Sequence, residues 1–125
     1  MHTFEHVELC MGTGFRFQGK HDSADFNVAM AKACEILHEA DRVFSLYKPE
    51  SPLSQLAAGK TSVAECPPEV SQVWDECEHW EKITDGWFSP FTAEHTFDPS
   101  GLVKTWAAKR AADSLIASGI VDFTM

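Results

Sequence analysis

The chain has 125 residues, of which 44% are hydrophobic and 11% aromatic, enough for one domain with a substantial core. Its 19 acidic and 10 basic residues give a net charge of −9, which repels phosphate backbones, so we expect no nucleic-acid partner. No apolar run reaches the roughly eighteen residues that span a bilayer, and the N-terminus lacks a signal-peptide pattern, so we expect no membrane segment and a cytoplasmic location.

Alternating apolar residues over 4–18, interrupted by a glycine-rich stretch at 12–14, predict a pair of strands. The alternation is expected to place Glu8 and Arg16 on the polar face. The apolar face is expected to carry Val7, Leu9, Met11, Phe15 and Phe17. An apolar stripe at helical spacing then predicts a helix over 24–44.

Residues 45–64 are rich in turn-forming residues, with a short turn or helix expected from Ser54. A second long helix is expected to begin at 67–69 and stop at 85–86, and a third to cover 101–117. Together these elements predict an α+β fold in which an antiparallel sheet packs against about three helices. We expect one domain over 1–125.

Residues 120–125 begin like a strand, and two interpretations are open. The segment is either a short edge strand that completes a small sheet with residues 4–18, or the start of a larger sheet whose next element lies elsewhere. Unpaired strand edges can pair between copies of a chain, so we also expect a dimer or larger homo-oligomer.

Four cysteines contain no C-x-x-C pair, which gives little support to a metal site. Cys10 and Cys34 are expected to be small buried hydrophobes in a reducing compartment. A zinc or redox site is a weak further possibility, since its spacing matches no closed zinc motif; it would use Cys66, Cys77 and His79. The remaining histidines, His6 and His38 among them, are expected to be mostly solvated.

The segment 97–113 is the most informative one. Asp98 and Lys104 flank backbone amides at an expected helix start, and this arrangement can hold a phosphate-bearing ligand. The alternative is a capped helix with a surface carboxylate and a surface ammonium group.

Four segments resemble, in order, the motif blocks of the ApbE family of FAD:protein FMN transferases; they are 11–13, 44–56, 84–90 and 98–113. The resemblance implies a T-fold-like α+β domain, corresponding to the N-terminal half of such an enzyme. It also implies FAD and magnesium as cofactors, and transfer of FMN to a threonine of an acceptor protein with release of AMP. The alternative is a non-catalytic flavin-binding or assembly module, or a truncated remnant of the enzyme.

The resemblance implies that five residues face the flavin and the adenine nucleotide. Met11 lines the flavin side of the pocket, and Tyr47 stacks on an aromatic ring of the ligand. The loop against the adenine-nucleotide end is formed by Trp87, Phe88 and Ser89. Each also has an ordinary alternative role, as a core methionine, a loop cap over the core, or a loop anchor.

Three further residues are implied at the polar end of the ligand. Asp98 accepts hydrogen bonds, Lys104 meets the pyrophosphate as a point charge, and the backbone of Gly101 approaches the metal. No residue is assigned as catalytic. Ser89 stands where the family usually has Asp, and Thr105 where it usually has Gly, and a β-branched side chain at that place can crowd a ligand.

Overall fold

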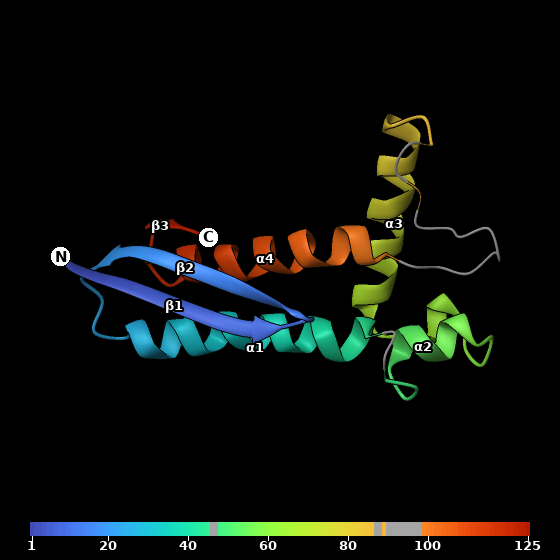
Figure 1. The fold of residues 1–125 in the computed structure, drawn as a ribbon, viewed down its shortest axis with the longest axis horizontal. Helices are drawn as coiled ribbons and strands as arrows, with labels where there is room; N and C mark the ends of the chain where they lie inside the picture. The colour runs from blue at the N-terminus through green and yellow to red at the C-terminus, as the bar shows by residue number, and fades with distance from the viewer. Residues whose placement is uncertain (46–47, 87–88, 90–98) are drawn as a thin grey trace. The chain divides into compact units, whose positions relative to one another are not determined.

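The computed structural model describes residues 1–45, 48–86, 89 and 99–125. Within these ranges the chain has an α+β architecture, with a three-stranded antiparallel sheet, four α-helices and one 3-10 helix (Figure 1). The chain divides into two compact units. Unit 1 comprises Met1–Glu39 and Ala107–Met125, and unit 2 comprises Ala40–Trp106. Each unit is described by itself below.

The sheet of unit 1 is a hairpin with one added strand. Strands β1 (His2–Cys10) and β2 (Thr13–His21) pair through a tight turn in which Met11 and Gly12 have φ of 54° and 70°. Two central residues with positive φ match the right-handed twist of the strands they connect. Strand β3 (Asp122–Thr124) pairs antiparallel with β2, so the predicted strands are confirmed.

The register of the hairpin corrects the expected apolar face. Because the turn contains two residues, it pairs odd-numbered positions of β1 with even-numbered positions of β2, and Glu8 lies opposite Phe15. Phe15 and Phe17 therefore share their face with Glu8 and not with Val7 and Leu9. The side chains on the other face are exposed, with Val7 at 50% and Leu9 at 76%.

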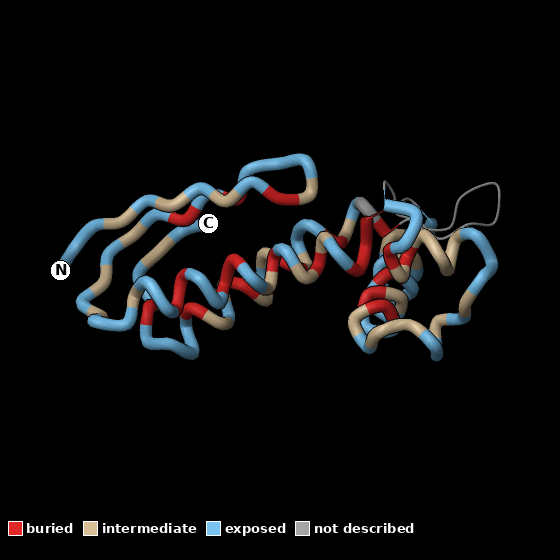
Figure 2. The backbone as a smooth tube through the Cα atoms, turned by 90° about the horizontal axis from the view of Figure 1, so that it is seen from below, coloured by how far each residue is buried: buried red, intermediate tan, exposed pale blue. Residues whose placement is uncertain are grey.

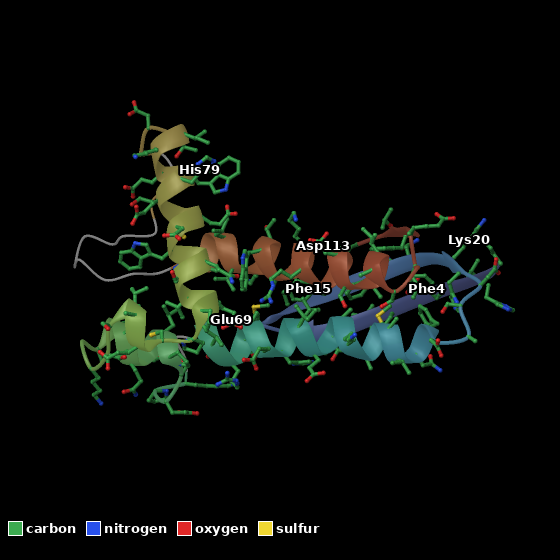
Figure 3. The ribbon with its side chains drawn as sticks, turned by 180° about the vertical axis from the view of Figure 1, so that it is seen from behind. Phe4, Phe15, Lys20, Glu69, His79 and Asp113 are labelled. Carbon is green, nitrogen blue, oxygen red and sulfur yellow. The ribbon has the colours of Figure 1, made fainter. Side chains whose placement is uncertain are left out.

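Two helices cover the inner face of this sheet within unit 1: α1 (Phe26–Phe44) as far as Glu39, and α4 (Ser100–Ala117) from Ala107. Figure 2 shows the strands as one layer and the buried stripes of the helices as the facing layer. Phe4, which is labelled in Figure 3, packs its ring against Phe26 with centroids 4.7 Å apart. The core of the unit includes Phe17, Ala33, Leu37, Ala111, Leu115 and Ile120.

Unit 2 consists of short helices and the loops between them. It contains α2 (Pro52–Ala57), a 3-10 turn (Val63–Glu65) and α3 (Pro68–Ile83), together with the last turn of α1 and the first half of α4. The apolar stripe predicted for α3 faces inward only in part: Val70, Val73 and Cys77 are buried, whereas Trp80 and Ile83 are exposed. The core of this unit includes Val43, Leu53, Val70, Val73, Cys77 and Val103.

Helix ends follow their sequence signals closely. Gly119, with φ of 89°, ends α4, and the N–H of Ile120 donates to the carbonyl of Leu115 over 3.0 Å. At the end of α3, Asp85 and Gly86 both have positive φ. In the part of the chain that the structure describes, no helix is both long enough and apolar enough to cross a membrane.

Candidate functional site

The β1–β2 turn holds Met11 in an unfavourable backbone conformation. A residue other than glycine in the left-handed region costs roughly 1–2 kcal/mol, and a turn of this type normally has Asn at this position. Beside the turn lies an open hollow of about 580 Å³, lined by Leu9, Cys10, Gly12, Thr13 and Gly14.

Three serines of unit 2, which we call the serine clamp, close the loop between α1 and α2. The hydroxyls of Ser51 and Ser54 both donate to the carbonyl of Ser45, the latter over 2.8 Å. The Ser51 hydroxyl also accepts the backbone N–H of Ser54 over 3.1 Å and thereby caps α2, with Pro52 in the first turn. Ser45 and Ser51 are buried. Tyr47 belongs to this loop but lies outside the described residues.

The sequence predicts a short turn or helix from Ser54, whereas α2 begins at Pro52 and is capped by Ser51, a structural role that was not predicted. The signal was present, because a serine directly before a proline at a helix start is typical of an N-cap. The position of the third serine, Ser54, one turn into the helix is what allows two hydroxyls to reach one carbonyl.

The turn after α3 places Ser89 near that helix. Thr84 follows the helix and donates its hydroxyl to the Trp80 carbonyl over 2.7 Å, and the N–H of Gly86 donates to the Glu81 carbonyl over 3.0 Å. Ser89 is exposed and donates its hydroxyl to Glu81 Oε2 over 2.6 Å. Trp87 and Phe88 lie outside the described residues.

Helix α4 begins as the sequence predicts, directly after a buried proline. The carbonyl of Pro99 accepts the N–H groups of Leu102 and Val103, over 2.8 and 3.0 Å. Gly101 and Lys104 are exposed, and their spacing of three residues places them on neighbouring turns of one helix side. Among the described residues no carboxylate forms an ion pair with Lys104, which leaves its charge available to an anion.

Of the residues that the sequence singles out, Met11 belongs to unit 1, whereas Ser89, Gly101 and Lys104 belong to unit 2. The residues that lie outside the described ranges are Tyr47, Trp87, Phe88 and Asp98. The expected pocket as a whole therefore stays a prediction.

A polar cluster in unit 1 was not predicted from the sequence. His6 Nε2 lies 2.8 Å from Glu8 Oε1, and His38 Nε2 lies 2.6 Å from Glu8 Oε2. The thiol sulfur of Cys34 lies 3.4 Å from His6 Nε2. We call these four residues the strand–helix cluster. His6 and His38 are in large part solvated, as expected, with side chains 38% and 49% exposed, but both also contact one carboxylate, which the sequence did not predict.

Hydrogen bonds within this cluster change the acidity of its members. The bonds from His38 and then His6 lower the pKa of Glu8 from 4.5 to about 2. Burial, followed by the hydrogen bond and the charge of Glu8, raises the pKa of Cys34 from 9.0 to about 12. The carboxyl group is thus ionised and the thiol neutral at ordinary pH.

The zinc site considered from the sequence does not form. Across the described ranges, the group of three or more side chains that can hold a metal ion is His6, Glu8 and Cys34. No such group includes the expected ligands, which are Cys66, Cys77 and His79. Burial raises the pKa of the Cys77 thiol, as it does for Cys66, and all four cysteines of the chain are free.

The described strands and helices form an α+β protein in which an antiparallel sheet packs against helices. A family model described as the ApbE family matches residues 11–96, more than half of the sequence, so the chain belongs to the ApbE family. Both the family and the fold class predicted from the sequence are confirmed.

Solved structures with the same fold come from two bacteria. The flavin transferase ApbE from Vibrio cholerae superposes with a TM-score of 0.83 at 16% identity, over 98% of this chain and 56% of that one. A mutant of that protein gives the same score over 59% of its length. The ApbE protein from Thermotoga maritima gives 0.78 at 13% identity, over 93% and 53%. This chain therefore spans little more than half the length of these proteins. A search of curated proteins found no match.

Proposed function

We propose that the chain is the FAD-binding N-terminal portion of a magnesium-dependent flavin transferase. In the proposed reaction the FMN part of FAD is transferred to a threonine of an acceptor protein, and AMP is released. The observation that carries the proposal is the family match over 11–96, which includes the Met11 turn, the serine clamp and the turn after α3. Because the matched structures are much longer than this chain, the reaction of a whole enzyme is proposed here by family membership.

The residues of this chain contribute binding and positioning. The Met11 turn and its hollow offer apolar atoms and exposed backbone to a planar ring. The serine clamp fixes both ends of the loop that carries Tyr47, and an aromatic residue on a fixed loop loses little entropy when it stacks on a ligand. Lys104, exposed near the N-terminal end of α4, supplies positive charge for a pyrophosphate, with Asp98 proposed to accept ligand hydrogen bonds nearby.

Magnesium enters the proposal through the family alone. Mg²⁺ prefers a set of oxygen ligands in octahedral geometry. Within the described ranges the candidate metal group combines nitrogen, oxygen and sulfur, which does not suit this ion. The backbone of Gly101 is a single oxygen donor. The described residues therefore do not by themselves fit a magnesium site, and we derive no step through the ion.

The first test is a titration of the chain with FAD and with riboflavin, followed by flavin fluorescence. Lys104→Ala is expected to weaken FAD binding by roughly 10-fold or more, because a charge-assisted hydrogen bond contributes about 1.5–3 kcal/mol. Riboflavin has no phosphate, so its binding should not change. Lys109→Ala is the matched control, since this lysine lies on the same helix but pairs with Asp113 over 3.1 Å. Absence of FAD binding would contradict the proposal.

The second test asks whether binding leads to transfer. The chain is mixed with FAD, magnesium and a threonine-containing acceptor peptide, and peptide-bound flavin and AMP are measured. The same mixture is repeated after adding the C-terminal half of an ApbE protein. Transfer in either mixture supports the transferase portion. Binding without transfer in both supports the alternative, a flavin-binding or assembly module.

A further inference from the structure

Two elements of unit 1 present polar side chains toward each other. His6 and Glu8 are two residues apart on β1, and because side chains alternate along a strand they lie on one face. Cys34 and His38 are four residues apart on α1 and lie on one side of the helix. Cys10 is a further even-numbered residue of β1 and therefore lies on the same face as His6 and Glu8. Its thiol donates to the Leu37 carbonyl over 3.3 Å, so this face is the one covered by α1.

The atoms of this cluster are spaced as metal ligands. One ligating atom each of His6, Glu8 and Cys34 lies within 4.8 Å of the other two. In tetrahedral zinc sites, bond lengths of about 2.0–2.3 Å place ligand atoms roughly 3.4–3.6 Å apart. The 3.4 Å between Cys34 Sγ and His6 Nε2 matches this spacing. The 2.8 Å between His6 Nε2 and Glu8 Oε1 is shorter than this spacing. Side-chain rotations that move each of the two atoms by a few tenths of an ångström would lengthen it.

The surroundings allow an ion to enter from solvent and then to be held. Cys34 is 8% exposed and forms the floor of the cluster. Above it, the exposed fractions of the side chains are 24% for Glu8, 38% for His6 and 49% for His38. Glu8 is held through both carboxylate oxygens, so its orientation toward the histidines is already fixed.

We propose that the strand–helix cluster binds a zinc ion, with His6, Glu8 and Cys34 as ligands and His38 completing a tetrahedral set. Zn²⁺ accepts thiolate, imidazole and carboxylate ligands, whereas Mg²⁺ and Ca²⁺ do not favour the thiolate and imidazoles of this set. His38 turns from its bond to Glu8 toward the ion. The Cys34 proton leaves to solvent on binding, because a coordinating thiol is deprotonated by the metal.

This site is separate from the proposed flavin chemistry. Its ligands come from β1 and α1, and none of the residues proposed for FAD is among them. A bound ion would join the hairpin to α1 and would stabilise unit 1 by binding only the folded state. The proposed role is structural.

The test uses the full chain without a polyhistidine tag, titrated with Co²⁺ as a spectroscopic substitute for Zn²⁺. We expect one equivalent to produce a thiolate-to-cobalt charge-transfer band and the intense visible bands of tetrahedral Co²⁺. One equivalent of Zn²⁺ should then remove both. Absence of these bands at micromolar protein and stoichiometric metal would overturn the proposal.

Variants assign the ligands. Cys34→Ser should abolish the charge-transfer band and weaken zinc binding by at least about 100-fold, more than the loss of an outer-shell partner usually costs. Cys77→Ser is the matched control, a buried free thiol of unit 2, and should leave both unchanged. A band that survives in Cys34→Ser and disappears in Cys77→Ser would reject the assignment.

Loss of folding is kept distinct from loss of the site by two further measurements. Far-ultraviolet circular dichroism checks each variant without metal. His6→Gln, which keeps a hydrogen-bond donor for Glu8, should fold normally and lose most zinc affinity. Zinc should also raise the melting temperature of the wild type and not that of His6→Gln. An equal rise in both would contradict the proposal. FAD titration is expected to be unaffected by His6→Gln, so failure of this site and failure of the flavin proposal give different results.

Discussion

Unit 1 and unit 2 hold their polar side chains together across very different distances along the chain. In unit 1 the strand–helix cluster joins residues 28 and 30 positions apart. In unit 2 the serine clamp joins residues 3, 6 and 9 positions apart. Local grouping leaves a motif that can be recognised in the sequence, whereas grouping through tertiary structure leaves none. The comparison explains why the serine clamp falls within one motif block, whereas the strand–helix cluster is found only in the structure.

The largest effect is expected when one buried leucine of each unit is replaced by alanine. Leu37→Ala in unit 1 and Leu53→Ala in unit 2 should each lower the free energy of unfolding by about 2–5 kcal/mol, because each leaves a cavity at a fully buried position. Urea denaturation measures the loss. Hydrogen exchange then locates it, and we expect faster exchange in β1 and β2 for Leu37→Ala and in α2 and α3 for Leu53→Ala.

The same pair of variants can also break the comparison. If both substitutions speed exchange equally in both sets of elements, the two units unfold as one cooperative structure and the division has no thermodynamic meaning. The control is Val7→Ala on the exposed outer face of the sheet, which should stay within about 0.5 kcal/mol of the wild type.

Much of the fold was predictable because its signals are local. The helices follow apolar stripes, and proline stands at the first position of α2 and of α3, while glycine follows the end of α4. The inner face of the hairpin was not predictable from alternation alone. It depends on how many residues the turn contains, and one residue more or fewer would have put Val7 and Leu9 beside Phe15.

The candidate site was predictable only in part, for the same reason. The Lys104 position and the Met11 turn carry motif letters and could be selected from the sequence. The cluster of His6, Glu8 and Cys34 could not, because nothing in a single sequence says which strand face meets which helix side. An i, i+2 pair on a strand and an i, i+4 pair on a helix are weak signals until the register is known.

The serine clamp gives the next largest effect. Ser51→Ala removes the N-cap of α2 and one of the two hydroxyl donors to the buried Ser45 carbonyl, so it should cost about 2 kcal/mol in urea denaturation. Because the clamp joins the two ends of the loop to which Tyr47 belongs, and Tyr47 is proposed to bind the ligand, FAD affinity should fall as well. Ser62→Ala is the matched control, since Ser62 is exposed and donates its hydroxyl to the exposed Glu65 carboxylate over 2.9 Å without capping the backbone, and it should change stability by less than about 0.5 kcal/mol. A loss no larger than that of the control would show that the clamp is not a stabilising feature.

A smaller effect is expected at two residues whose backbone is in the left-handed region. One lies in each unit, and each is followed by a glycine. Met11→Asn should raise stability by roughly 0.5–1 kcal/mol, because Asn tolerates this conformation and suits this turn. It should also weaken FAD binding if methionine is retained for the ligand. Asp85→Asn is the control: Asp and Asn both adopt this conformation, so neither stability nor binding should change much. Unchanged FAD affinity in Met11→Asn would remove Met11 from the proposed site.

The last comparison concerns the buried thiol of unit 2. Burial, with smaller contributions from the carboxylates of Glu76 and Glu81, raises the pKa of Cys77 from 9.0 to about 11. The unfolded chain ionises this thiol first, so the stability that the neutral thiol provides is complete below the unfolded pKa of 9.0 and is lost as the pH rises toward 11. The difference in free energy of unfolding between wild type and Cys77→Ala should therefore shrink from about pH 8 to about pH 10, whereas other alkaline titrations cancel in the comparison. Urea denaturation at several pH values measures it. If the difference in free energy of unfolding stays constant over this range, Cys77 reaches solvent as readily in the folded state as in the unfolded one. The core of unit 2 would then be looser than the layered core of unit 1.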